Sequence, residues 1–260
     1  MEGTLQLRDR TVVLTGPLTR VHQAIVNRLT GLGANVALLG AEAQAAERFT
    51  SQIMDLREVH AHQGRAGSIP VDFHDARSIA EAMSRTAESF GGIDIYIDGW
   101  LAPNRFSFAA DNFAELLQST VEYELLATIK TTQAALPFLK GRRRGRIIYL
   151  VHDLYSHGHP DIMLNAATRT GLFHFARALG NSLRAENIGV NCLRLGLTEE
   201  SLLQLYPGQS VAEAESQLVQ QFPRIEMSRP EDIANFIAFL ASPLSQTLSG
   251  QNLSAHRGFY

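Results

Sequence analysis

The chain has 260 residues, of which 45% are hydrophobic and 19% are charged, so it can bury a sizeable core and is not a disordered chain. Its 23 Lys and Arg residues and 26 Asp and Glu residues give a formal net charge of -3, which argues against a protein that coats nucleic-acid phosphates. The single cysteine, Cys192, excludes an intramolecular disulfide framework and a zinc site built from several cysteines.

The sequence also indicates in which cellular compartment the protein is expected. The first residues, MEGTLQLRDR, lack the apolar core of a signal peptide. No stretch approaches the roughly 20 apolar residues that a membrane helix needs. A lone thiol fits a reducing environment. We therefore expect a soluble, cytoplasmic protein with no nucleic-acid or membrane partner.

Short β-rich runs alternate with longer amphipathic stretches along the chain. The predicted strands lie at residues 12–14, 36–39, 69–71, 93–97, 146–151, 188–195 and 251–254. The first predicted helix ends near residue 32, and others occupy residues 42–57, 77–90, 112–139, 162–186 and 230–240, with two shorter helical pieces before the last of these.

Apolar strands that alternate with helices predict βαβ units and a parallel sheet covered on both faces. Such crossovers are nearly always right-handed, which favours a doubly wound, Rossmann-like α/β fold of about seven strands. No repeat, low-complexity tract or long polar linker divides the chain. The prediction is a single domain that spans residues 1–260.

One basic cluster, KGRRRGR, occupies residues 140–146, between a predicted helix and the strand that follows it. Cations suit the C-terminus of a helix, where the helix dipole is negative. This favours a solvated turn. A contact with a phosphate or with coenzyme A is the alternative.

Several motifs then occur in a recognisable order: TVVLTG at the start, Asp72 after the third strand, GGIDIYID at the fourth, TTQAALPFLKGRRRGRIIYL, ATRTGLFHFARALGNSLRAENIGVNCLRLG, and RPEDIANFIAFLASPLSQTLSGQNL. In this order and spacing the chain resembles the short-chain dehydrogenase/reductase family over nearly its whole length. The resemblance implies hydride transfer between NAD(P) and an alcohol or carbonyl. It also implies an active site of Tyr-x-x-x-Lys, Ser and Asn, in which a nearby cation must lower the pKa of the phenol from about 10.

Each of these active-site positions carries a different residue here. The resemblance places Asn165 at the Tyr position and Arg169 at the Lys position, with His152 at the Ser position and Glu124 at the Asn position. Asn cannot titrate, and Arg cannot give up its proton. We therefore predict that these four residues do not perform the family's proton transfer.

The motif that would bind the cofactor is also altered. The family writes TGxxxGxG where the first strand turns into its helix, because a Cβ would keep the pyrophosphate from the helix N-terminus. This chain writes TGPLTRVH, so Gly16 remains while Arg20 and His22 replace the other glycines. Asp72, which faces the adenine in the family, is the other residual position. We predict that Arg20 and His22 block the site and that this chain binds no cofactor.

The remaining cofactor-facing loops differ as well. The second strand ends Leu39-Gly40-Ala41, with neither an acid for a ribose nor an Arg for a 2′-phosphate. The family's Asn-Asn-Ala-Gly after the fourth strand is replaced by DGWL at residues 98–101. Trp100 is predicted to project near the nicotinamide space, as a plug or a stacking surface.

These losses make a non-catalytic subunit of a hetero-oligomeric NAD(P)-dependent dehydrogenase our leading hypothesis. Its partner would be an intact sister subunit of the same family, or a second copy of this chain, docked through the two long helices. The alternatives are an enzyme with new chemistry in the same cleft, a reductase that works without the Tyr, and a small-ligand binding module. New chemistry would mean either a relative of the halohydrin dehalogenases or an acid/base centre in which His152 is the base, Glu124 orients it and Arg169 holds an anion.

A metal site is not predicted. His157, His159 and Asp161 have a metal-like spacing, but HGHP is a turn sequence.

Overall fold

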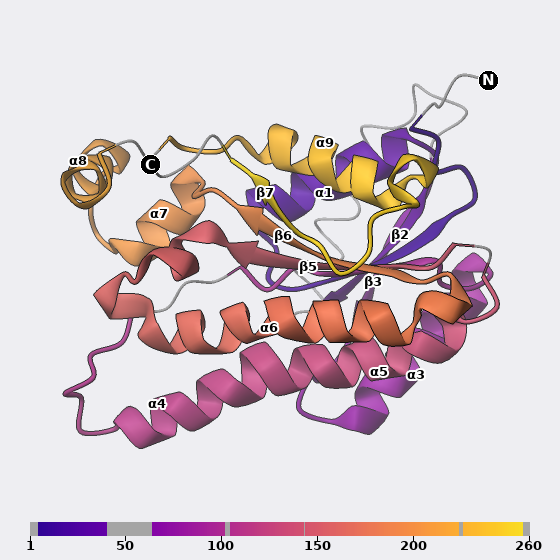
Figure 1. Cartoon of the computed structure of the whole chain (residues 1–260), viewed down its shortest axis with the longest axis horizontal. Helices are drawn as coiled ribbons and strands as arrows, with labels where there is room; N and C mark the ends of the chain where they lie inside the picture. The colour runs from indigo at the N-terminus through magenta and orange to yellow at the C-terminus, as the bar shows by residue number, and fades with distance from the viewer. Residues whose placement is uncertain (1–4, 41–63, 102–104, 143, 224–225, 257–260) are drawn as a thin grey trace.

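The computed structural model describes residues 5–40, 64–101, 105–142, 144–223 and 226–256. Its centre is a seven-stranded parallel sheet with the strand order β3-β2-β1-β4-β5-β6-β7 (Figure 1). The strands are β1 (Thr11–Thr15), β2 (Asn35–Gly40), β3 (Ala66–Pro70), β4 (Ile95–Asp98), β5 (Arg146–His152), β6 (Gly189–Leu195) and β7 (Asn252–Ala255).

Helices cover both faces of this sheet. One face carries α1 and α9, and the other carries α3, α5 and α6, with α4 extending the line of α5 (Figure 1). The short helices α7 and α8 lie beyond the carboxyl ends of β5 and β6. The helices are α1 (Arg20–Gly31), α3 (Ala76–Phe90), α4 (Phe113–Thr120), α5 (Ala127–Leu139), α6 (Met163–Ser182), α7 (Glu199–Leu205), α8 (Val211–Gln221) and α9 (Pro230–Ala241).

The pleat of the strands divides the core into two layers. In β1, Val12 and Leu14 pack into the cluster that holds α1 and α9, whereas Val13 packs into the cluster that holds α3, α5 and α6. Successive side chains of a strand point to opposite faces, so a strand buried on both sides must be apolar at every position. This is why β1 and β5 read as continuous apolar runs.

Local signals set the helix ends. The hydroxyl of Thr19 accepts a hydrogen bond from the backbone N–H of His22 and begins α1, and the carboxylate of Asp75 does the same for α3. Gly91, with φ 80°, ends α3 in the left-handed conformation that glycine adopts at little cost.

The long helical segment predicted at residues 112–139 is interrupted by a π-helical stretch, Val121–Leu126, between α4 and α5. Such π-bulges insert an extra residue and shift the face that each side chain occupies. In this stretch Glu124 is 9% exposed, whereas Tyr123 and Leu126 are 45% and 41% exposed. The interruption therefore accompanies the burial of the one acidic side chain at the predicted site.

The predicted fold class is confirmed, since all seven described strands are parallel and belong to one sheet with helices on both faces. The predicted helix at residues 42–57 lies outside the described residues. The helix predicted at residues 162–186 ends earlier, at Ser182, because Asn187, with φ 57°, closes a separate short turn. In the described part of the chain, no helix combines the length and apolar character needed to span a lipid bilayer.

Candidate functional site at the carboxyl edge of the sheet

The strand order reverses between β1 and β4, and such a switch point opens a crevice at the carboxyl ends of parallel strands. Gly16 follows β1 with φ 120°, and Gly99 follows β4. A Cβ on Gly16 would lie 2.4 Å from the Gly99 carbonyl oxygen, so only glycine allows this approach. The two turns that border the crevice are therefore held in close contact.

His22 lies beneath this crevice rather than in it. Its side chain is fully buried, with Nδ1 2.7 Å from the Thr19 hydroxyl and Nε2 3.3 Å from the Thr15 carbonyl oxygen. Burial lowers the pKa of His22 from 6.5 to about 4, so the ring is neutral at pH 7. His22 and Arg20 replace the glycines whose loss was predicted to block the site, and the His22 ring is buried against the turns of Gly16 and Gly99.

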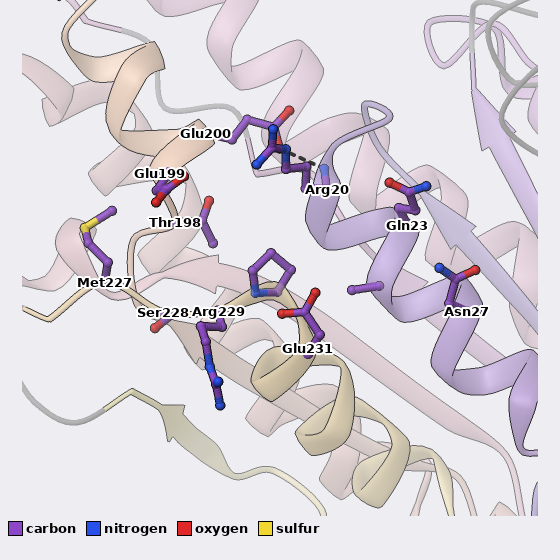
Figure 2. Close-up of a pocket in the computed structure, with 12 residues that line it drawn as sticks. Arg20, Gln23, Asn27, Thr198, Glu199, Glu200, Met227, Ser228, Arg229 and Glu231 are labelled. Atoms are coloured by element: carbon purple, nitrogen blue, oxygen red, sulfur yellow. Dashed lines mark hydrogen bonds between the residues drawn. The ribbon is translucent and has the colours of Figure 1, made fainter. Parts of the chain in front are cut away.

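The N-terminus of α1 is occupied by a carboxylate of the chain itself. The backbone N–H of Arg20 donates a hydrogen bond of 2.8 Å to Oε2 of Glu200, the second residue of α7 (Figure 2). A helix N-terminus attracts anions through its free N–H groups and its dipole. Arg20 itself is exposed. Its backbone therefore holds an anion at the place where the resemblance puts a cofactor pyrophosphate.

A cavity of about 400 Å³ opens beside this contact. Figure 2 shows it between the first turns of α1, the start of α7 and the start of α9. Its polar lining comes from Arg20, Gln23, Asn27, Thr198, Glu200, Ser228 and Arg229, among others.

A second cavity, of about 380 Å³, lies on the other side of the crevice, at the ends of β3 and β4. Asp72 borders it and is exposed, with one oxygen accepting a hydrogen bond of 2.9 Å from the His74 N–H. Trp100 also borders it, with its ring 5.1 Å from that of Phe73 in an edge-to-face contact. Trp100 therefore leans toward β3 and does not fill the nicotinamide space as predicted.

Arg169 is buried deep behind the crevice. Its guanidinium lies 2.7 Å from the carboxylate of Asp98 and 2.6 Å from the Leu150 carbonyl oxygen, and it also donates to the backbone carbonyl of Glu124 at 3.1 Å. Burial lowers the pKa of Arg169, but the charges of Asp98 and Glu124 outweigh that effect, so the net pKa lies above its ordinary value. Thr128 completes the set with a hydrogen bond of 2.9 Å to Asp98.

Glu124 and Asn165 contact each other directly. The carboxylate of Glu124 accepts hydrogen bonds from the Asn165 amide and, at 2.6 Å, from the Thr168 hydroxyl. Burial raises the pKa of Glu124, although Arg169 and these two donors act in the opposite direction. The site thus holds a buried carboxyl group with a raised pKa at the position where the family has an Asn, in contact with Asn165 at the position of the family's Tyr.

His152 ends β5 and is 1% exposed. Its Nε2 lies 3.0 Å from the Leu101 carbonyl oxygen and 3.3 Å from the hydroxyl of Ser201 in α7. A carbonyl can only accept, so Nε2 carries the proton and Nδ1 does not. Burial lowers the pKa of His152 to about 4, which keeps the ring neutral at pH 7.

The predicted arrangement of His152 as a base oriented by Glu124 is not formed. The described partners of the Glu124 carboxylate are Asn165 and Thr168, and those of His152 are Leu101 and Ser201. Nor does Arg169 face an open anion site, because its guanidinium is turned inward to Asp98. Four predicted positions therefore lie close together, but they split into a Glu124–Asn165 pair, an inward-facing Arg169 and a separate His152.

The sequence analysis missed four residues that shape this site: Asp98, Thr128, Glu200 and Ser201. Asp98 left a signal. An acid stands where the family has an Asn, in the same chain in which an Arg replaces the Lys, and such a double change indicates a new ion pair. The contact between Glu200 and Arg20 could not be predicted from a local sequence pattern, because 180 positions separate the two residues.

The stretch that contains His159 forms short helical turns. Nδ1 of His159 accepts a hydrogen bond of 3.3 Å from the Asp161 N–H, and Asp161 pairs with Arg105. Among the described residues, no group of three His, Cys, Asp or Glu side chains is arranged to hold a metal ion.

Comparison with known proteins identifies the family. A family model described as enoyl-(acyl carrier protein) reductase matches residues 22–260. The chain is 24% identical over 251 residues to the 3alpha-hydroxysteroid dehydrogenase of Mediterraneibacter gnavus, covering 96% of each protein. It is 22% identical to the 3-oxoacyl-acyl-carrier-protein reductase FabG of Aquifex aeolicus over 98% of this chain and 99% of that protein. A short-chain dehydrogenase from Burkholderia cenocepacia, solved in complex with NADP, superposes with a TM-score of 0.83 at 26% identity over 98% of this chain and 99% of that one. The chain belongs to the short-chain dehydrogenase/reductase family, a family of oxidoreductases.

These findings overturn two predictions. The hypothesis of a non-catalytic subunit is contradicted, because the relatives are named as dehydrogenases and reductases and nothing in them indicates a subunit without activity. The prediction that this chain binds no cofactor is contradicted by the NADP complex of the Burkholderia cenocepacia protein, which has the same fold. The physical reason is that the His22 ring is fully buried against the Thr19 hydroxyl and the Thr15 carbonyl, so a side chain at this position does not by itself fill the crevice.

Proposed function

We propose that the protein is an NAD(P)-dependent oxidoreductase for a secondary alcohol or ketone, with an atypical centre in which Glu124 exchanges the proton that the family assigns to a Tyr. The single observation that carries this proposal is the buried Glu124 carboxyl group in direct contact with Asn165. The substrate class follows from relatives named as dehydrogenases of a 3alpha-hydroxysteroid and of cyclohexanol, and as a reductase of 3-oxoacyl carrier protein.

The described residues fit a dinucleotide at four places. Gly16 and Gly99 bring the two turns that border the crevice into close contact, with Nε2 of the buried His22 packed against both. No atom of the described residues lies within 4 Å of where a Cβ on Gly40 would be, so that part of the chain leaves space open at the end of β2. The cavity beside Asp72 and Trp100 is suited to the adenosine end. The N–H groups at the start of α1 would hold the diphosphate once Glu200 withdraws.

When bound, the nicotinamide supplies the acceptor or donor of a hydride. Glu124 accepts the hydroxyl proton during oxidation and returns it to the carbonyl oxygen during reduction. A carboxyl group with a raised pKa suits both directions, because it loses and gains a proton closer to the pH at which the enzyme works. Asn165 and Thr168 orient the carboxylate through their hydrogen bonds.

Arg169 is a positioning residue in this account. Because its guanidinium binds Asp98 and the backbone carbonyl of Glu124, it ties the end of β4 to the π-helical stretch that carries Glu124. It does not offer a free cation to a cofactor ribose.

The test is the kinetics of Glu124→Gln. The purified chain is assayed at 340 nm with NADH and NADPH against a cyclic ketone, a 3-ketosteroid and a 3-oxoacyl thioester. Gln keeps the size of the side chain but removes the proton exchange and turns one acceptor oxygen into a donor, so we expect kcat to fall about 100-fold or more while cofactor affinity is unchanged. In the parent, the rate of alcohol oxidation should rise with pH through a pKa above 4.5, and E124Q should lack that rise.

Glu122→Gln is the matched control, since Glu122 lies half-buried two residues away and pairs with Gln118. It should keep the activity of the parent. Full activity in E124Q, or an unchanged pH profile, would contradict the role of Glu124 without affecting the claim of cofactor binding.

We also propose that the chain assembles with a second copy of itself through the outer face of α4, the π-helical stretch and α5. This face exposes Leu117, Tyr123 and Leu126 at 41% to 45%. Exposed large apolar groups gathered on one helical face are typical of an interface. Analytical ultracentrifugation of the pure chain distinguishes this homo-oligomer from a monomer and from an assembly that needs a sister subunit.

A cytoplasmic location remains part of the proposal and rests on the buried free thiol of Cys192.

A further inference from the structure

A third cavity, of about 800 Å³, lies at the opposite edge of the sheet, where β5 and β6 begin. It is bordered by the end of α6 and by the loop that leads into β7. Its polar lining includes Arg144, Arg146, Asn181, Arg184, Gln246 and Ser249. No Asp or Glu among the described residues lines it, so its walls carry positive charge and neutral hydrogen-bonding groups only.

Arg146 forms the floor of this cavity. It is 3% exposed, and the one described hydrogen bond of its guanidinium runs from Nη1 to the Gly145 carbonyl oxygen at 2.9 Å. Its Nε has no partner, and no described carboxylate pairs with its guanidinium. The side chain lies against Gly189, where a Cβ would be 3.4 Å from Cδ of Arg146, so glycine leaves the arginine room. A buried charge without a counterion is costly and needs an explanation.

Further arginines surround this group instead of acids. Nη2 of Arg10 donates a hydrogen bond of 2.5 Å to the Arg144 carbonyl oxygen. This bond holds the Arg10 side chain against the turn that precedes β5. Burial, with the charges of Arg10 and Arg144, lowers the pKa of Arg146 to about 10. At pH 7 the Arg146 guanidinium is therefore still protonated. Among the described residues, the acid that pairs with the neighbouring arginines is Asp94, which lies 3.7 Å from Arg10 and 3.9 Å from Arg142 and does not line the cavity.

We infer that this cavity binds a small molecule that carries a phosphate monoester or diphosphate group, with Arg146 as the buried anchor and Arg144 and Arg184 closing on the anion from the rim. A planar guanidinium donates two parallel hydrogen bonds to phosphate oxygens. The amides of Asn181 and Gln246 and the hydroxyl of Ser249 supply further donors. The volume is in the range of a small-molecule site and exceeds what a lone ion needs.

This site is separate from the proposed active centre, which lies at the other ends of the same strands. It gives the basic cluster at residues 140–146 a role beyond that of a solvated turn. The inference does not depend on the proposed oxidoreductase activity.

The test is isothermal titration of the full chain at constant ionic strength with inorganic phosphate, pyrophosphate and glycerol 3-phosphate, with chloride as the reference. We expect one saturable site per chain, with glycerol 3-phosphate or pyrophosphate bound more tightly than phosphate. A preference for phosphate itself would point to the free ion as the source and would overturn the assignment to a phosphorylated molecule.

Arg146→Gln should weaken binding at least tenfold, because it removes the anchor. Asn181→Asp is the second variant, used if Arg146→Gln does not fold. Residue 181 is exposed, so this change should leave the fold intact. Its carboxylate on the cavity wall should repel the anion and weaken binding about tenfold. Arg77→Gln, on the distant helix α3, is the control and should bind as the parent does. An absence of saturable binding, or equal binding by the parent and both cavity variants, would overturn the inference.

Discussion

At the scale of single residues, the central feature is the buried ion pair of Asp98 and Arg169. Both side chains are at most 1% exposed, and their charged atoms lie 2.7 Å apart. Taking two charges out of water is costly, so each partner depends on the other. Asp98 therefore compensates for the Arg that stands at the family's Lys position, and the pair fixes the backbone that presents Glu124.

Asp98→Asn tests this dependence. The substitution leaves the buried Arg169 charge without its closest partner, so we expect the free energy of unfolding to fall by about 3–5 kcal/mol. Urea denaturation followed by circular dichroism measures it. Glu81→Gln is the control, because it breaks the exposed Arg77–Glu81 pair and should leave stability unchanged within error. An equal fall in the free energy of unfolding in Asp98→Asn and Glu81→Gln would contradict the claim that Arg169 depends on Asp98.

At the scale of elements, α7 links the two halves of the site. Its adjacent residues Glu200 and Ser201 reach the N-terminus of α1 and the ring of His152. In this conformation α7 holds an internal anion where a cofactor diphosphate would bind. Cofactor and Glu200 therefore compete for the same backbone N–H groups.

Glu200→Gln should relieve that competition. A charge at a helix N-terminus is worth about 0.3–2 kcal/mol, so we expect NADPH to bind roughly two- to thirtyfold more tightly to the variant. Titration of the nicotinamide fluorescence measures the affinity. Glu215→Gln, on the exposed side of α8, is the control and should leave it unchanged. Weaker binding in E200Q would mean that Glu200 supports the cofactor instead.

The elements were the part of the structure that the sequence predicted best. Strand runs such as residues 146–151 and the glycine-ended helices follow from periodicity and capping, which are local properties. The π-helical stretch was not predicted, because nothing in VEYELL distinguishes it from an α-helix. The direction of a side chain is not local either. His22 was expected in the crevice, and only the closeness of the Gly16 and Gly99 turns shows why it lies beneath.

At the scale of the whole molecule, the two ends of the parallel strands carry two different candidate sites. The carboxyl edge holds the crevice, the Glu124 carboxyl group with its raised pKa, and the neutral buried rings of His22 and His152. The amino edge holds the arginine-lined cavity. Because every described strand is parallel, these edges cannot exchange roles, and the proposed reaction and the proposed phosphate site stay apart.

The two buried histidines make the fold sensitive to acid. Burial lowers the pKa of His22 and of His152 from 6.5 to about 4, so as the pH falls below 6.5 the unfolded chain takes up protons before the folded chain does. Their stabilising effect is fully present above pH 6.5 and is lost as the pH falls toward 4. We expect a loss of about 2–3 kcal/mol per histidine between pH 7 and pH 4.5.

Urea unfolding at a series of pH values measures this loss. His22→Gln and His152→Gln should each flatten the dependence of unfolding free energy on pH, whereas the exposed His74→Gln should not. Parallel curves for the parent and both buried variants would contradict the assignment.

The most direct test of the account is whether the purified chain, with no other subunit present, binds a nicotinamide dinucleotide. Isothermal titration with NADH and NADPH should give one site per chain for at least one of them, with 2′,5′-ADP or ADP competing. No measurable binding of either dinucleotide, both in the parent and in E200Q, would contradict the claim that this crevice holds a cofactor.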